Sequence, residues 1–327
     1  MVTRRRVMLL SALGLMGAHA LSRAQPSSGI HRVGVLLTRP QASNSQLGAF
    51  RDAMRELGWV EGGNVEYRTV SANGDVDRLD ALAIELIRDN VELIVAASSA
   101  GTRAAQRATK TIPIVMVAAS NAVESGFVAS LGKPGGNITG VSNQREEAFR
   151  KLIQILHEVV PDARRIGILL NERNPSYRTL EAAAQSACSA LKLAALPALA
   201  SDREQLSGAV SEMTRRQSQA VVVMPDPVYL DERVNLHKLL QAARLPAAYG
   251  LRDHVIAGGL LSYAADLSGN YRSAARYVDR ILKGARPAEL PVEQPTKYEL
   301  TVNLNTAQAL GITIPQSVLV RVDEVIK

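Results

Sequence analysis

Residues 91–105 read VELIVAASSAGTRAA, and this stretch decides the fold. The run Leu93–Ala97 is apolar throughout, which is typical of a strand buried on both faces of a parallel sheet. The run ends at Ser98 and Ser99, where an alanine-rich helical pattern begins. At such a junction a hydroxyl can cap the helix. The free N–H groups at the positive end of the helix dipole can also hold a carboxylate.

The same order of strand and polar strand end recurs along the chain. Ile112–Ala119 leads into Ser-Asn, Arg165–Leu170 leads into an Asn-rich loop, and Ala220–Met224 leads into Asp226 between two prolines. In open α/β sheets, ligands bind outside the carboxyl ends of the strands. These polar strand ends therefore predict the rim of a ligand-binding pocket.

Length and composition predict two soluble globular domains of ordinary size. The chain has 327 residues, 46% of them hydrophobic, and a mean hydropathy of 0.00. The formal net charge is +7, but residues 1–24 contain four arginines and no acidic residue. In the rest of the chain basic and acidic residues are interleaved, and no stripe of basic and aromatic residues is present. Nucleic-acid binding is therefore not expected.

Residues 1–24 are predicted to be a cleavable signal peptide that sends the protein to the periplasm. Arg4–Arg6 form a positive segment, Val7–Ala18 an apolar segment, and Ala20 or Ala24 ends a small-residue cleavage motif. General secretion and the twin-arginine route both remain open. The alternative is a membrane anchor, for which the apolar segment is short. No cysteine lies near this leader, which excludes a bacterial lipoprotein anchor.

The alternation of strands and helical patterns predicts a doubly wound α/β protein with two lobes. We expect an N-terminal lobe over residues 30–143, a C-terminal lobe over 144–256, and a hinge near Ser142–Arg150. A short helix is expected over Ser125–Leu131. Residues 257–327 contain proline-rich extended segments, so we expect them to cross between the lobes and to complete the N-terminal lobe in part.

Four segments resemble the periplasmic substrate-binding proteins of the TrpX-like ABC transporter family. They are GKPGGNITGVS (132–142), GGLLSY (258–263), ARYVDRILKG (275–284) and LPVEQPTKYEL (290–300). The likeness runs from about residue 32 to residue 327. It implies a type I periplasmic-binding-protein fold, with two Rossmann-like lobes that close on a small solute. Some members look like receptors for tryptophan or other aromatic amino acids.

The residues predicted to bind such a solute lie at the strand ends. An amino-acid zwitterion needs donors for its carboxylate and an acceptor for its ammonium group. Ser98, Ser99 and the backbone N–H of Ala100 suit the carboxylate, and Asp226 suits the ammonium group. Asn121, Ser142, Asn171 and Asn174 are candidates for further hydrogen bonds, and Tyr249 and Tyr263 for stacking on an apolar side chain. The alternatives are plain helix caps, turn residues and packed rings.

One departure from the family affects the choice of solute. Many members carry Asp-Pro after the fourth strand, whereas this chain carries Asn121 and Ala122. The substitution removes an anionic partner. Aromatic residues make up only 4% of the chain, so an aromatic cage is not expected.

Catalysis, cofactors and metals are not predicted. Motifs for a nucleophile elbow, a zinc protease, a phosphate loop or a dinucleotide fold are absent from the sequence, as is metal-ligand spacing. The single cysteine, Cys188, is expected to be a small buried residue. The prediction is a monomeric periplasmic receptor that delivers an amino acid or a related small carboxylate to an ABC permease and its ATPase subunit. The alternative is a ligand-sensing protein of the same fold that acts on a membrane sensor.

Overall fold

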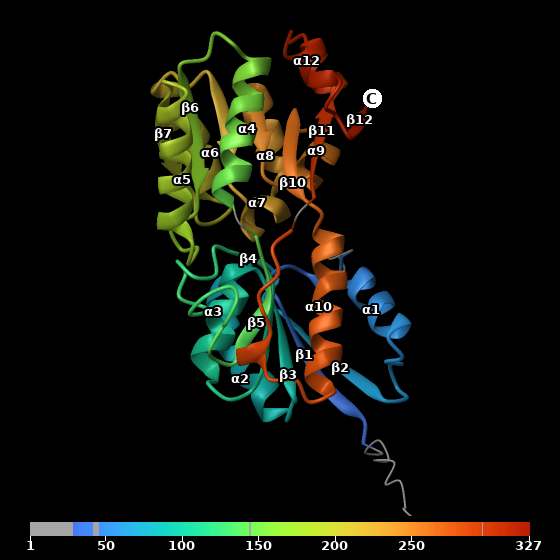
Figure 1. Cartoon of the computed structure of the whole chain (residues 1–327). Helices are drawn as coiled ribbons and strands as arrows, with labels where there is room; N and C mark the ends of the chain where they lie inside the picture. The colour runs from blue at the N-terminus through green and yellow to red at the C-terminus, as the bar shows by residue number, and fades with distance from the viewer. Residues whose placement is uncertain (1–28, 42–45, 144, 296) are drawn as a thin grey trace, which may run out of the picture.

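Two sheets, one in each lobe, organise the chain (Figure 1). The structure is a computed structural model that describes residues 29–41, 46–143, 145–295 and 297–327. The sheet of the N-terminal lobe is parallel and has the order β2-β1-β3-β4-β5. Its strands are β1 (His31–Leu37), β2 (Val65–Ser71), β3 (Leu93–Ala97), β4 (Ile114–Ser120) and β5 (Ile138–Asn143).

Helices cover both faces of this first sheet. On one face α1 (Gln46–Glu56) packs beside α10 (Leu267–Leu282), although the two are far apart in the sequence (Figure 1). On the other face lie α2 (Leu79–Arg88), which follows the 3₁₀ turn η2 (Val76–Arg78), and α3 (Ser98–Ala108). Because both faces are covered, every residue of β3 is buried. The strand predicted over Leu93–Ala97 is confirmed at both ends.

The sheet of the C-terminal lobe has the order β12-β11-β10-β9-β8-β6-β7 and is parallel except for the pair β10 and β11. Helices α4, α5, α11 and α12 pack on one face and α6, α8 and α9 on the other. The strands are β6 (Arg165–Leu170), β7 (Ala194–Leu199), β8 (Ala220–Val223), β9 (Ala247–Tyr249), β10 (Leu261–Ala265), β11 (Tyr298–Asn303) and β12 (Glu324–Ile326). The helices are α4 (Arg145–Val159), α5 (Tyr177–Ala190), α6 (Gln205–Arg215), α7 (Pro227–Asp231), α8 (Arg233–Ala242), α9 (Asp253–Ile256), α11 (Leu304–Ala309) and α12 (Gln316–Leu319).

The chain passes between the lobes three times. It leaves the N-terminal lobe after β5, returns between β10 and α10, and leaves again after Glu293 (Figure 1). On its return it adds α10 and η3 (Pro287–Glu289) to the N-terminal lobe. Glu293 then lies against β5, where its N–H donates to the carbonyl of Gly140 at 2.9 Å and its carbonyl accepts from Ser142 at 2.9 Å. The C-terminal quarter of the sequence therefore contributes to both lobes.

The short helix predicted over Ser125–Leu131 is wrong, because the segment is a series of turns. The hydroxyl of Ser125 donates to the carbonyl of Ser120 at 2.9 Å, and Gly126 has a φ of +67°. A left-handed residue so early in the segment interrupts helical hydrogen bonding. The segment turns back on itself instead, and the N–H of Phe127 donates to the carbonyl of Ala122.

Gly140, inside the segment that resembles the family, has a steric reason to be glycine. Its φ is +123°, and a Cβ at this position would lie 2.3 Å from the carbonyl oxygen of Met116 in β4. Pairing of β4 with β5 is irregular between Met116 and Ala119. Close approach of the two strands therefore depends on the missing side chain.

The predicted signal peptide, residues 1–24, lies outside the described residues. Within the part of the chain that the structure describes, no helix has the length and apolar character needed to cross a bilayer.

Candidate functional site

A cavity lies between the two lobes, where the carboxyl ends of their strands face each other. It contains about 640 Å³ of space that atoms do not fill, part of which is open to solvent. The N-terminal lobe, the C-terminal lobe and α10 all contribute to its lining. These residues are Thr38, Arg39, Gln46, Ala97, Ser98, Ser99, Val117, Ala118, Ser120, Asn174, Pro225, Asp226, Pro227, Leu230, Leu251, Leu267 and Tyr271.

The wall from the N-terminal lobe is built from β1, β3 and β4, which are neighbours in the sheet. Arg39 follows β1, Ser98 and Ser99 begin α3 directly after β3, and Ala118 lies near the end of β4. Ser98 has a φ of +63° and Ala118 a φ of +56°. Left-handed backbone is costly at such residues and gathers at functional sites. The buried Ser98 Oγ has no hydrogen-bond partner within the described part of the chain.

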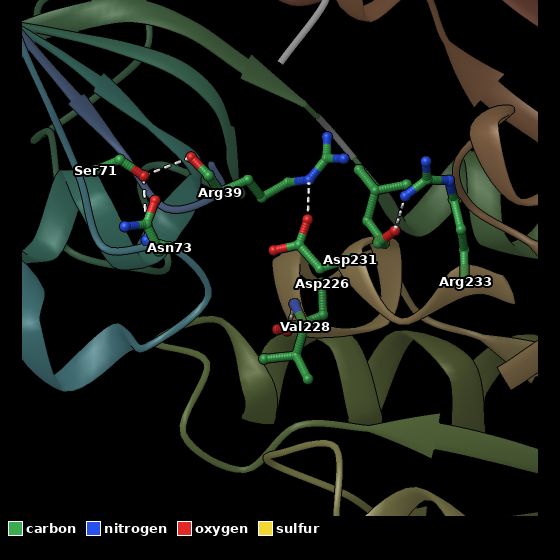
Figure 2. A network of polar contacts seen from close by, with 8 residues as sticks. Arg39, Ser71, Asn73, Asp226, Val228, Asp231 and Arg233 are labelled. Carbon is green, nitrogen blue, oxygen red and sulfur yellow. Dashed lines mark hydrogen bonds and ion pairs between the residues drawn. The ribbon is translucent and has the colours of Figure 1, made fainter. Parts of the chain in front are cut away.

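The wall from the C-terminal lobe carries a buried carboxylate, Asp226, which follows β8 and is 5% exposed. Its Oδ1 accepts from Nδ2 of Asn171 at 3.1 Å and from the N–H of Val228 at 3.0 Å. Its Oδ2 accepts from Nδ2 of Asn174 at 2.8 Å. Asp226 thereby caps α7 (Figure 2). These donors and the prolines on either side of Asp226 fix the orientation of its carboxylate.

Polar contacts between the lobes close the cavity. Arg39 Nε donates to Oδ1 of Asp231 in α7 at 2.7 Å, and the Arg39 side chain is 8% exposed (Figure 2). Burial raises the pKa of Asp231, and the nearby Arg39 offsets part of this rise. The hydroxyl of Ser176 donates to Ser99 Oγ at 2.9 Å. Both pairs join residues of opposite lobes, so the structure shows the lobes closed on each other.

Four of the predicted site residues line this cavity, namely Ser98, Ser99, Asn174 and Asp226. Asn171 lies directly behind the lining, because its amide contacts the Asp226 carboxylate. Ala100 does not line the cavity. It lies in α3 and is half-exposed.

The other four predicted residues do not line the cavity. Asn121 and Ser142 lie where β4 and β5 end, and Ser142 Oγ accepts from the N–H of Ala122 at 3.0 Å. The ring of Tyr249 is 1% exposed and stacks on His254, with ring centroids 4.7 Å apart. The ring of Tyr263 stacks on Tyr298 at 5.5 Å. Both tyrosines are therefore committed to packing within the C-terminal lobe.

Sequence reasoning missed several residues of the lining. Arg39 stands two residues after β1, so the same attention to strand ends that selected Ser98 would have found it. Gln46, Leu267 and Tyr271 lie in the helices α1 and α10, where no local signal marks a binding residue. Tyr271 reaches the cavity only because α10 returns to the N-terminal lobe.

The described residues offer neither a metal-binding cluster nor a reactive cysteine. In them no three residues from histidine, cysteine, aspartate and glutamate form a group that suits a metal ion. Burial raises the pKa of the Cys188 thiol to about 11, which keeps the thiol protonated near neutral pH.

Comparison with known proteins gives the family. The model of the family described as ABC transporter substrate binding protein matches residues 33–326. A tyrosine-binding protein of Clostridioides difficile (strain R20291) is 22% identical over 328 residues, which cover 95% of this chain and 94% of the relative.

Two solved structures show the same fold. The ABC domain in complex with L-Trp from Streptococcus pneumonia has a TM-score of 0.86 and 24% identity over 91% of this chain and 100% of its own. A ligand-free, open substrate-binding protein with adhesive properties from Clostridium difficile has a TM-score of 0.66 and 21% identity over 91% of this chain and 100% of its own. The resemblance noted in the sequence is thus confirmed. The chain belongs to the ABC transporter substrate-binding proteins and has the two-lobed fold of type I periplasmic binding proteins.

Proposed function

We propose that the cavity between the lobes binds an α-amino acid with an apolar side chain. The observation that carries this proposal is the opposite charge of the two facing walls. The N-terminal lobe presents the Arg39 guanidinium and the first turn of α3, whereas the C-terminal lobe presents the buried Asp226 carboxylate. A zwitterion placed between them meets a charge of opposite sign at each end.

The ligand carboxylate would lie against the N-terminal lobe. The hydroxyl of Ser98 and the N–H groups at the start of α3 can donate to it. Arg39 uses its Nε for Asp231, and its two Nη groups make no hydrogen bond within the described part of the chain. A guanidinium buried in this way is well suited to a carboxylate.

The ligand ammonium group would lie against Asp226, and its side chain would lie against the apolar lining. Leu230, Leu251 and Leu267 supply aliphatic surface, and Tyr271 supplies a ring. Tyr271 is the only aromatic residue in the described lining, so an aromatic ligand would stack on one face instead of entering a cage. The names of the relatives support the same class, since one binds tyrosine and one was solved with L-Trp.

Such a ligand contacts both lobes at once, and this favours the closed form. A ligand shifts an equilibrium only by its differential affinity for the two states. The closed pair of lobes would then be the shape that an ABC permease and its ATPase subunit recognise. We infer that the protein acts in this way as a monomeric import receptor in the periplasm.

The test is binding to protein that has been unfolded, freed of carried-over ligand and refolded. We expect a raised melting temperature with one or a few of the twenty L-amino acids, tested with L-tryptophan and L-tyrosine first. Asp226→Asn keeps the shape of the side chain and removes its charge. We expect it to lower the affinity measured by calorimetry about 10- to 100-fold, since a hydrogen bond to a charged group is worth about 1.5–3 kcal/mol.

Asp162→Asn is the matched control, because Asp162 is exposed in a turn of the same lobe. Failure of every amino acid to bind, or unchanged affinity in Asp226→Asn, would refute the proposed ligand class. Import itself is tested by uptake of the bound amino acid in cells with and without the gene for this protein.

A further inference from the structure

The loop between β6 and α5, residues 171–176, holds the Asp226 carboxylate with two asparagines. Nδ2 of Asn171 donates to Oδ1 at 3.1 Å and Nδ2 of Asn174 donates to Oδ2 at 2.8 Å, so each asparagine serves one carboxylate oxygen. The other end of each amide is also fixed. Oδ1 of Asn171 accepts from the N–H of Arg173, and Oδ1 of Asn174 accepts from the N–H of Ser176, both at 2.9 Å. Asp226 and the backbone of this loop are thus joined rigidly.

The same loop also makes contacts with the other lobe. The hydroxyl of Ser176, which is 1% exposed, donates to Ser99 Oγ at 2.9 Å and lies 3.2 Å from Ser125 Oγ. Arg173 forms an ion pair with Asp77 in η2. All of these partners lie in the N-terminal lobe, so the contacts exist only while the lobes are closed.

Ser99 links this contact to the wall expected to hold the ligand carboxylate. Its Oγ accepts from the N–H of Ser120 at 2.9 Å and also from Ser176, and it lies in the first turn of α3. A continuous series of hydrogen bonds therefore runs from Asp226 through Asn174 to Ser176 and across the cleft to Ser99. One end of the series is the proposed amine site, and the other end is the contact between the lobes.

We propose that residues 171–176 form a coupling loop, which links occupation of Asp226 by a ligand amine to closure of the lobes. Asn171 and Asn174 are positioning residues for Asp226, and Ser176 carries the closing contact. This inference rests on the proposed function, because it takes an amine as the group that Asp226 binds. The hydrogen bonds that Asp226 accepts from Asn171 and Asn174 lie within one lobe and persist when the cleft opens, whereas the contacts of the Ser176 hydroxyl with the other lobe do not.

Two variants separate these roles. Asn174→Leu keeps the size of the side chain and removes its amide, so Asp226 loses the donor on Oδ2 and the Ser176 N–H loses its acceptor. We expect it to lower the preference for an amine at least tenfold. Ser176→Ala removes the hydroxyl that makes the neutral contacts of the closed form with Ser99 and Ser125, and it should weaken all ligands at least about fivefold, with the preference unchanged.

The preference for an amine is measured as a ratio of dissociation constants. The probes are L-tyrosine against 3-(4-hydroxyphenyl)propionate, and L-tryptophan against indole-3-propionate, by calorimetry. Small-angle X-ray scattering of the saturated protein reports closure, and we expect ligand-saturated Asn174→Leu to remain more open than the wild type. Asn305→Leu and Ser189→Ala are the controls, because both residues are exposed in helices of the same lobe.

Coupling is tested by the double variant. If the loop transmits one effect, Asn174→Leu with Ser176→Ala should weaken L-tyrosine or L-tryptophan by less than the product of the two single factors. Equal weakening of amine and des-amino probes by Asn174→Leu, or factors that multiply, would overturn the inference. Asn174→Ser, which keeps a side-chain oxygen for the loop, replaces the leucine variant if that one does not fold.

Failure of the proposed function looks different. In that case the wild type binds none of the amino acids. If only the coupling inference fails, the wild type binds, but the dissociation constants of the variants do not change in the expected ratios.

Discussion

We expect the protein to lose stability in mild acid because of the buried ring of His254, and one substitution should remove this loss. The ring lies in α9, is 2% exposed and stacks on Tyr249, and neither ring nitrogen has a hydrogen-bond partner within the described residues. Burial, with smaller contributions from Arg233 and Arg39, lowers the pKa of His254 from 6.5 to about 3. The folded protein therefore keeps this ring neutral at a pH where the unfolded chain protonates it.

The size and sign of the effect follow from proton linkage. Between pH 6.5 and pH 3 the unfolded state binds one proton more than the folded state, so stability is complete above pH 6.5 and is lost as the pH falls. At pH 5 the solution is 1.5 units below the unfolded pKa, and each unit is worth about 1.36 kcal/mol. His254 alone should then cost about 2 kcal/mol between pH 7.5 and pH 5.

The measurement is urea unfolding of the wild type and of His254→Phe at both pH values. Phenylalanine keeps a ring on Tyr249 and removes the titration. Both proteins share all other ionisable groups. The change in unfolding free energy between the two pH values therefore differs between them only by the contribution of His254. We expect His254→Phe to lose about 2 kcal/mol less than the wild type on acidification. An equal loss in both proteins would show that His254 is not held neutral in the fold.

Three further predictions follow from single contacts. Gly140→Ala should destabilise the protein by at least about 3 kcal/mol in urea unfolding, because its Cβ would lie 2.3 Å from a backbone carbonyl oxygen. The control Gly136→Ala has nothing within 4 Å of its Cβ and should change stability by less than about 1 kcal/mol. Similar effects of the two substitutions would contradict the steric argument. Cys188 should react with a thiol reagent at pH 8 only as fast as the protein unfolds, and rapid labelling of native protein would show an accessible thiolate. Arg39→Met should weaken amino-acid binding, measured by calorimetry, about 10- to 100-fold. Asp231→Asn leaves the guanidinium in the cavity and should weaken binding less than about fivefold. Equal effects would show that Arg39 only joins the lobes and does not bind the ligand.

Buried parallel strands were the part of the fold most open to prediction from sequence. Leu93–Ala97 and Arg165–Leu170 have the predicted bounds, because a strand buried on both faces is apolar along nearly its whole length. Short elements were missed, including α9 and β12, since three or four residues carry no period. The helix predicted over Ser125–Leu131 was wrong because the sequence pattern does not show that Gly126 adopts a left-handed conformation.

The site was predictable where it follows the sheet and not where it follows the helices. The strand-end rule selected Ser98, Ser99, Asn174 and Asp226, and all four line the cavity. It also selected Tyr249, whose ring turns into the C-terminal core instead, because the rule gives a residue's position and not the direction of its side chain. The contribution of α10 depends on a return of the chain to the other lobe, which no local pattern specifies.

That return of the chain sets the order in which the protein can be completed during synthesis. One face of the N-terminal sheet is covered by Tyr271, Val278 and Leu290, which are made after both sheets have most of their strands. Until then α1 covers the apolar side chains of β1 and β3 on that face only in part, and the cover is complete only when about nine-tenths of the chain exists. The first lobe to be translated is thus completed only after most of the second lobe has been made. A nascent chain of this design stays incompletely folded through most of its translation.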